Sequence, residues 1–150
     1  MHLKVLVGEG KHVMGLTVLP AAACIAANVM WPATFRLGVG TPGILLGIAA
    51  FSLGIPLWIV SVIQILIFVP RKKLITWGPF ALMRHPLYTS VALLVIPGCG
   101  LVLDTWVGFA IGALLYASSR IFSPREERLL ERYFPVEYPS YREGVLFPWL

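Results

Sequence analysis

Charge and cysteine are both scarce in this sequence. Charged residues make up 13% of the 150 residues, and the two cysteines, Cys24 and Cys99, lie inside apolar runs. A disulfide framework is therefore not expected, and both cysteines are predicted to pack as small apolar side chains. The first ten residues are of mixed character and no small-residue cleavage motif follows a short apolar core, so no cleavable signal peptide is predicted.

Apolar residues, by contrast, are abundant, at 58% of the chain. A soluble domain of this length does not need so much apolar content, so the composition predicts a membrane protein with a single domain. The net charge of +5 could suggest nucleic acid in a soluble protein. Here the charges flank apolar segments, which favours membrane topology, and no nucleic-acid partner is expected.

Four apolar stretches cover roughly residues 13–30, 42–69, 87–103 and 105–122. A spanning helix needs about 20 apolar residues, and continuous runs of this kind are typical of helices rather than of barrel strands. The predicted fold is an all-α integral membrane protein with about four transmembrane helices and a cytoplasmic tail, 123–150, that contains an amphipathic helix. The second stretch is long enough to tilt or to bend at Pro56. The third is short and carries Pro97, Gly98 and Gly100 near its end, so an early end within the headgroup region stays an open alternative for it.

The basic residues are distributed unevenly around these stretches. If the chain begins inside and crosses four times, eleven of the twelve basic residues fall on the inner side and Arg36 alone falls outside. Cytoplasmic segments carry an excess of Lys and Arg, so both termini are predicted to be cytoplasmic. The loop at 70–86 and the tail share this face, and any active site is expected there.

Glycine occurs in two kinds of pattern. Gly43 with Gly47, and Gly108 with Gly112, are spaced four apart within apolar stretches. Small residues at this spacing let helices approach closely in lipid, so helix contacts are predicted at both pairs. Residues 38–43 also match Gly-x-Gly-x-x-Gly, but no strand precedes them, and a plain turn is expected rather than a phosphate-binding loop.

The first polar block contains the run Arg84-His85-Pro86-Leu87-Tyr88. Pro86 suits the first turn of the third helix, where no backbone donor is needed. His85 then lies at the N-terminal end of that helix, where free N–H groups and the helix dipole favour anionic groups. This block is a candidate to hold a carboxylate, a phosphate or the polar edge of a cofactor; an ordinary interfacial cap is the alternative. The basic run before it, at 70–73, is interpreted as an anchor to anionic lipid.

The second polar block begins at Ser123-Pro124, which predicts the start of a new helix there. On a helix at about 100° per residue, Glu126 lies in the middle of an apolar face and Glu127 lies at its polar edge. A carboxylate on an apolar face is costly unless it is paired, so Glu126 is predicted to be functional, with Arg84, Arg120 or the ammonium of a ligand as its partner. Glu127 is interpreted as part of a solvated face.

Together the two blocks resemble the isoprenylcysteine carboxyl methyltransferase family and its phospholipid methyltransferase relatives. The family pattern is a Gly-x-Tyr/Phe turn, Arg-His-Pro-x-Tyr, a membrane hairpin, Glu-Glu-x-x-Leu, Phe-Gly and two tyrosines. The resemblance covers about residues 64–148, and order, spacing and hairpin all agree. Ser90 and Pro135 stand where the family usually has glycine. The corresponding segments here are Gly78-Pro79-Phe80, Arg84-His85-Pro86-Leu87-Tyr88, Glu126-Glu127-Arg128-Leu129-Leu130, Phe134-Pro135, Tyr138 and Tyr141.

The resemblance implies S-adenosylmethionine as the methyl donor and a lipophilic or lipidated acceptor whose reacting group is a carboxylate or a thiol. His85 and Arg120 are the expected catalytic residues, because His85 could remove a proton from a thiol or an amine and Arg120 could bind an anionic group. Relatives that methylate prenylcysteine carry an arginine four residues before the first Glu; here that position is Phe122, and Arg120 or Arg125 could substitute. The implied cofactor-binding residues are Gln64, Lys72, Lys73, Leu74, Ile75, Phe80, His85, Pro86, Leu87, Tyr88 and Glu126.

Two other interpretations stay open. A membrane reductase of the sterol-reductase type would share the Arg-His-Pro-x-Tyr block but use NADPH; the Glu-Glu-x-x-Leu pair and the small size favour the methyltransferase. A non-catalytic membrane scaffold would leave the inward-facing Glu126 unexplained. Membrane lipids are expected partners, and no metal is expected. The helix at 125–134 is expected to act as a lid that excludes water.

Overall fold

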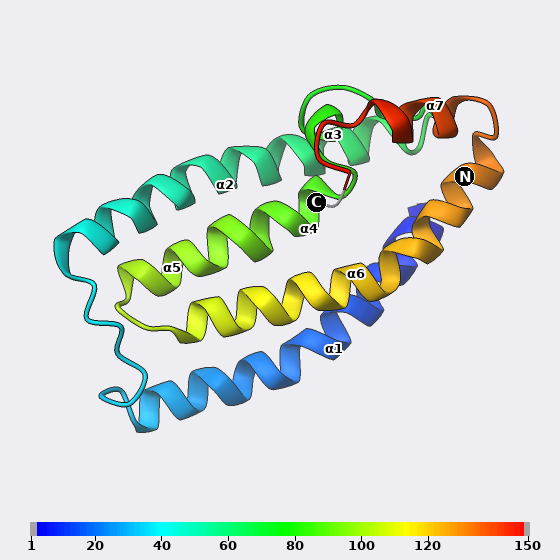
Figure 1. The fold of residues 1–150 in the computed structure, drawn as a ribbon. Helices are drawn as coiled ribbons and strands as arrows, with labels where there is room; N and C mark the ends of the chain where they lie inside the picture. The colour runs from blue at the N-terminus through cyan, green and yellow to red at the C-terminus, as the bar shows by residue number, and fades with distance from the viewer. Residues whose placement is uncertain (1–2, 149–150) are drawn as a thin grey trace.

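Four long helical segments stand side by side in a single row in the computed structural model, which describes residues 3–148, with side chains for Val13 and for residues 15–148. Across the row the order is α2, then α4–η1–α5, then α6, then α1 (Figure 1). The described residues contain no β-strand, only two isolated bridges, so the all-α prediction is confirmed. The elements are α1 (Leu3–Met30), α2 (Gly40–Phe68), α3 (Pro79–Leu82), α4 (Pro86–Ser90), the π-helix η1 (Val91–Val95), α5 (Ile96–Val102), α6 (Val107–Tyr133) and α7 (Glu137–Gly144).

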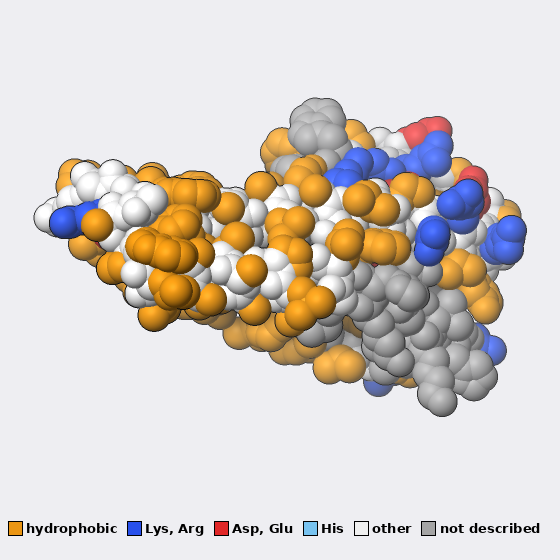
Figure 2. Space-filling model, turned by 90° about the horizontal axis from the view of Figure 1, so that it is seen from below, with side chains coloured by type: hydrophobic (Ala, Val, Ile, Leu, Met, Phe, Trp, Pro, Cys, Tyr) orange, Lys and Arg blue, Asp and Glu red, His pale blue; other side chains and the backbone are white. Residues whose placement is uncertain are grey.

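Helix α2 is long and apolar enough to cross a membrane, and among the described residues it is the one helix that meets both conditions. Two shorter apolar stretches, Gly15–Met30 and Pro86–Val102, correspond to the first and third predicted spans. Large apolar side chains are exposed along the row, and basic side chains gather mainly at one end (Figure 2). Pro56 lies inside α2 and does not end it. The row therefore has the outer surface of a membrane protein, and four crossings stay a prediction.

The third helical segment does not end early at Pro97 and agrees with the predicted stretch at 87–103. It continues from α4 through η1 to the end of α5 at Val102. The Ile96 N–H donates to the carbonyl of Val91, five residues back, so the turn before the proline is one residue wider than an α-turn. Proline lacks the N–H that would close the next α-turn, and a single π-turn inside an α-helix is one way to absorb such a local break.

The predicted helix start at Pro124 is wrong. Helix α6 runs without interruption from Val107 to Tyr133, with Pro124 inside it. Proline leaves the carbonyl four residues earlier without its backbone donor, but membrane helices tolerate this where hydroxyl side chains and neighbours satisfy the backbone. That carbonyl belongs to Arg120; Ser123, just before the proline, adds a hydroxyl hydrogen bond at 2.7 Å to the carbonyl of Ser119, one residue earlier. The fourth predicted span and the amphipathic tail helix are thus one helix.

Glycines bring neighbouring segments into backbone contact. A Cβ added at Gly47 of α2 would lie 2.7 Å from the Gly98 carbonyl oxygen of α5, and one at Gly108 of α6 would lie 2.6 Å from the Gly100 Cα. Neither site has room for a larger side chain, so the predicted helix contacts at these two residues are confirmed. Gly43 is different, because its nearest neighbour is Val39 at the start of its own helix.

The outer turn of the row is closed by Asp104. Its carboxylate accepts hydrogen bonds from the Gly38 N–H at 2.8 Å and the Val39 N–H at 3.1 Å, and from the Arg36 Nε at 2.8 Å. The Arg36 hydrogen bond and these amides hold the pKa of Asp104 below its ordinary value. The glycine-rich segment at 38–43 therefore serves as a turn that binds the chain's own carboxylate, as expected for a segment with no strand before it.

At the other ends of the long helices, away from Asp104, the C-terminal residues fold back over α3 (Figure 1). We refer to this as the site end of the row. The Leu146 N–H donates to the Ala81 carbonyl at 3.2 Å, and the Phe147 N–H donates to the Leu82 carbonyl at 2.8 Å. We call residues 145–148 the C-terminal strap. With α7 it covers the end of the row at which α2, α4 and the last turns of α6 meet.

Candidate active site

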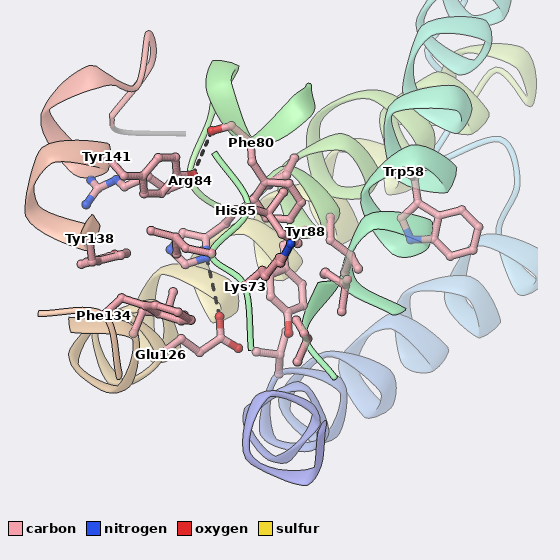
Figure 3. A pocket seen from close by; sticks show the side chains of 18 of the residues that line it. Trp58, Lys73, Phe80, Arg84, His85, Tyr88, Glu126, Phe134, Tyr138 and Tyr141 are labelled. Carbon is pink, nitrogen blue, oxygen red and sulfur yellow. Dashed lines mark hydrogen bonds and ion pairs between the residues drawn. The ribbon is translucent and has the colours of Figure 1, made fainter. Parts of the chain in front are cut away.

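A cavity of about 540 Å³ lies beneath α7 and beside α4, and its wall draws on segments from α1 to α7 (Figure 3). One part of the wall is polar and the other is apolar. The polar part consists of Lys73, Arg84, His85, Tyr88, Glu126, Tyr138 and Tyr141. The apolar part consists of Val13, Trp58, Ile65, Val69, Leu74, Ile75, Phe80, Pro86, Leu87, Val91, Leu115, Leu130 and Phe134.

The position of His85 follows from the local sequence. Gly78, at φ +67, allows the turn that starts α3 at Pro79, and a Cβ there would lie 2.9 Å from the Gln64 amide nitrogen. His85 is the N-cap of α4, Pro86 follows in the first turn, and the His85 carbonyl accepts the Thr89 N–H at 3.0 Å. The histidine is thus held by the backbone at the head of a helix, with its ring directed at α6.

The His85 ring lies between the two carboxylates of the Glu126-Glu127 pair. Its Nδ1 is 3.6 Å from Glu126 Oε2 and its Nε2 is 3.2 Å from Glu127 Oε1. His85 is 9% exposed and Glu126 is 7% exposed, so the prediction that Glu126 faces inward is confirmed. Both ring nitrogens donate only when the imidazole is protonated. Two acids around one imidazole can therefore hold a proton or attract a cationic ligand group.

Glu127 is not part of a solvated face, so that prediction is wrong. Its carboxylate is 3.0 Å from Arg84 Nη1 as well as hydrogen-bonded to His85, and its side chain is 20% exposed. Burial acts to raise the pKa of Glu127, but the His85 hydrogen bond and the charge of Arg84 outweigh it, and the pKa lies below its ordinary value of 4.5. The acid is thus ionised over the physiological range and keeps Arg84 and His85 in place.

Arg84 links this cluster to the C-terminal strap. Its Nε donates to the Pro148 carbonyl at 2.9 Å, and its Nη2 donates to the same oxygen. Its Nη1 is committed to Glu127, and its side chain is 16% exposed. The guanidinium therefore ties the strap to the acid pair.

Two tyrosines of α7 form the roof of the polar part. The Tyr141 hydroxyl donates to the Phe80 carbonyl at 2.8 Å, and burial raises its pKa to about 12. Burial also raises the pKa of Tyr138, which is 2% exposed. Both phenols thus stay protonated at any physiological pH. Because residues 125–134 belong to α6, the predicted lid is not a separate element; the segment that covers the cavity is α7 with the strap.

Most of the residues predicted for the site line this one cavity. Those brought together are Lys73, Leu74, Ile75, Phe80, His85, Pro86, Leu87, Tyr88 and Glu126. Gln64, Lys72 and Arg120 do not line it.

Each of these three is placed elsewhere for a physical reason. Gln64 is 3% exposed and its amide donates to the Trp77 carbonyl at 3.3 Å, so it supports the turn before α3. Lys72 is exposed and has a φ of +56, at the end of α2. Arg120 precedes Glu126 by six residues on one continuous helix, which places the two on different faces.

Several lining residues were not predicted. Trp58, Val91 and Leu115 lie in apolar stretches in which no local signal distinguishes a cavity wall from a lipid-facing surface. Tyr138 and Tyr141 are different, because they belong to the motif that carries the family resemblance and were expected either at the membrane interface or folded back over the pocket; the second position is the observed one. Their three-residue spacing on one helix was the available signal that both face the same site.

Residues 43–137 match a family model described as Phospholipid methyltransferase. The matched region begins in α2 and ends at the start of α7, so it contains the His85 and Glu126 segments that form the polar part of the cavity. Neither a comparison with curated proteins nor one with solved structures gives a match.

Proposed function

This chain belongs to the phospholipid methyltransferase family, and on that premise we propose that it is a membrane-embedded methyltransferase that uses S-adenosylmethionine to methylate a lipophilic acceptor. The observation that carries the proposal is the buried carboxylate of Glu126 opposite His85, in a cavity whose other part is apolar. The family match gives no support to the reductase or the scaffold alternative.

The cavity residues around Glu126 fit S-adenosylmethionine. A cavity of about 540 Å³ is within the range that accommodates small organic ligands. Glu126 offers a buried carboxylate to an ammonium group, and the aromatic rings of Phe80 and Phe134 offer flat apolar surfaces to a base. When bound, this cofactor supplies a methyl group already activated on a sulfonium centre.

The chain's own contribution is then to align the acceptor and to control its proton. Alignment in a water-poor cavity accounts for much of the rate in such transfers. An acceptor carboxylate is ionised at neutral pH and needs no base. A thiol or an amine must first lose a proton, and His85 in its neutral form lies in the cavity to accept it on Nδ1, while Glu127 accepts the hydrogen bond from Nε2–H. Arg120 does not line the cavity, so we assign it no role in the reaction.

The apolar part of the cavity fits an acceptor that arrives through the bilayer. It is lined by Val13 of α1, by Trp58 and Ile65 of α2, and by Leu115 of α6. Over the described residues α1 and α2 do not pack against each other, because they are the two outermost helices of the row, one on each side. A lipophilic molecule could thus reach the cavity sideways between them.

We further propose four membrane crossings with both termini and the site on the cytoplasmic side. The described basic side chains other than Arg36 lie in the segments at the site end of the row, which supports this orientation (Figure 2). Lys4 and Lys11, which belong to the same count, have side chains outside the described ones. A water-soluble cofactor would then enter from the cytosol, on the side that α7 and the strap cover.

Calorimetric titration of S-adenosylhomocysteine into the detergent-solubilised protein tests the assignment. Wild type is expected to bind, and Glu126→Gln is expected to bind roughly tenfold or more weakly, because a charged hydrogen-bond partner is lost. Glu131→Gln, an exposed acid on the same helix, is the matched control and should bind as wild type does. Absence of binding by wild type, or equal binding by both variants, contradicts the proposal.

A further inference from the structure

The cavity has one cation that the site described so far does not use. Arg84 is committed to Glu127 and to the strap carbonyl of Pro148. Lys73 lines the same cavity, and its ammonium forms no hydrogen bond or ion pair with any described residue. In the view of Figure 3 its side chain lies between the His85–Glu126 pair and Trp58. It therefore stands where the polar part of the wall gives way to the apolar part.

The end of α2 is built so that Lys73 faces this way. The Lys73 N–H donates to the Phe68 carbonyl at 3.2 Å, and the Lys72 N–H donates to the Val69 carbonyl at 3.1 Å. This pair of bonds is a Schellman motif, whose left-handed position is usually glycine. Here Lys72 occupies it at a φ of +56, a conformation that costs a non-glycine residue free energy. The motif reverses the chain after α2 and sets the direction of the next side chain.

We propose that Lys73 binds an anionic group of the methyl acceptor, a phosphate or a carboxylate, and so selects acceptors whose head group is negatively charged. This inference rests on the proposed function and names the acceptor class for that site. Lys73 is exposed and also lines the cavity, so its ammonium can pair with the anionic head of a molecule whose apolar part enters the cavity. A cationic methyl donor is favoured on the side of the two acids, away from a second positive charge, which leaves Lys73 to the acceptor.

The test uses two anionic amphiphiles, dodecyl phosphate and dodecanoate, and the neutral dodecanol, titrated by calorimetry into the full chain in a neutral maltoside detergent. Lys73→Ala removes the ammonium and Lys73→Arg keeps a cation. Lys72→Gly is the matched control, because it removes the neighbouring charge while glycine adopts the positive φ freely. S-adenosylhomocysteine is titrated into the same variants.

We expect Lys73→Ala to bind at least one of the two anions roughly tenfold more weakly than wild type, because a charge-assisted contact is lost. The affinity for dodecanol should be unchanged. Lys73→Arg and Lys72→Gly are expected to bind both anions much as wild type does, and the anion that wild type binds more tightly distinguishes phosphate from carboxylate. The inference is overturned if neither anion binds wild type, if Lys73→Ala and Lys72→Gly behave alike, or if Lys73→Ala loses S-adenosylhomocysteine instead. Failure of wild type to bind S-adenosylhomocysteine would contradict the proposed function, and the anion titrations would still decide the role of Lys73.

Discussion

Replacing Glu127 by Gln removes a charge from the centre of the polar cluster and leaves the shape of the side chain intact. The carboxylate contacts Arg84 Nη1 at 3.0 Å and His85 Nε2 at 3.2 Å, in a region where all three side chains are at most 20% exposed. A hydrogen bond to a charged group contributes about 1.5–3 kcal/mol and a neutral one about 0.5–1.5 kcal/mol. The difference is about 1 kcal/mol per contact, so the variant should lose about 2 kcal/mol of stability.

In a chain of 150 residues each kcal/mol shifts the melting temperature by about 2–4 °C, so the expected fall is roughly 4–8 °C. Thermal unfolding in neutral detergent, followed by tryptophan fluorescence at pH 7, measures it. Glu131→Gln is the control, because that acid is exposed on the same helix and should change the melting temperature little.

The difference between wild type and Glu127→Gln should also depend on pH with a definite sign. The folded-state pKa of Glu127 lies below its ordinary value of 4.5, so its contribution is fully present above that value. It is lost as the pH falls through the lowered folded-state pKa, where wild type becomes protonated and resembles the amide. Equal melting of Glu127→Gln and Glu131→Gln at pH 7 would refute the role assigned to this acid, as would a gap that stays constant down to acid unfolding.

Three further predictions concern packing, the roof and the outer turn. Gly112→Ala should destabilise the protein by about 1–3 kcal/mol in the same melting assay, because the new Cβ would lie 2.4 Å from a backbone oxygen of η1. Gly15→Ala is the control; it has open space around it and should be neutral or slightly stabilising. Tyr141→Phe should speed release of S-adenosylhomocysteine several-fold in stopped-flow measurements, because about 1 kcal/mol of hydrogen bonding is removed from the roof. Tyr133→Phe, at an exposed position, should leave the release rate unchanged. Equal release rates for the two variants would argue against a covering role for α7. Asp104→Ala should accelerate hydrogen exchange of the two amides, Gly38 and Val39, whose hydrogen bonds this carboxylate accepts. In wild type the protection of these amides, relative to their intrinsic exchange rate at each pH, should fall as the pH falls through the lowered pKa of Asp104. Unchanged exchange in the variant would show that the turn is held by other bonds.

Local periodicity was enough to place Glu126 but not Glu127. A helical wheel uses only the residues of one helix, and on that basis Glu126 falls among apolar neighbours, where the structure buries it. The partners of Glu127 lie 42 and 43 residues earlier in the chain, at the head of a different helix. No pattern within α6 could indicate them, since they depend on how α4 packs against α6.

Proline was the least reliable guide to where helices begin and end. Pro124 was expected to mark a helix start and Pro97 left an early helix end open, yet both lie inside continuous helical segments. The loss of one backbone donor is local, whereas the packing of a long apolar helix acts over its whole length, so the second effect prevails. The glycine spacing was a better guide at Gly47, Gly108 and Gly112, because close helix contact depends on the absence of a side chain more than on tertiary detail.

The unbroken course of α6 has a consequence for how the protein responds to its membrane. A helix of 27 residues is about 40 Å long, with the tight glycine contacts near one end and the acid pair near the other. If a bilayer of different thickness changes the inclination of this helix, both ends move together. His85 is carried by a separate short helix, so, on the proposed crossing of α6, we expect the spacing between imidazole and carboxylates to depend on the thickness of the surrounding lipid.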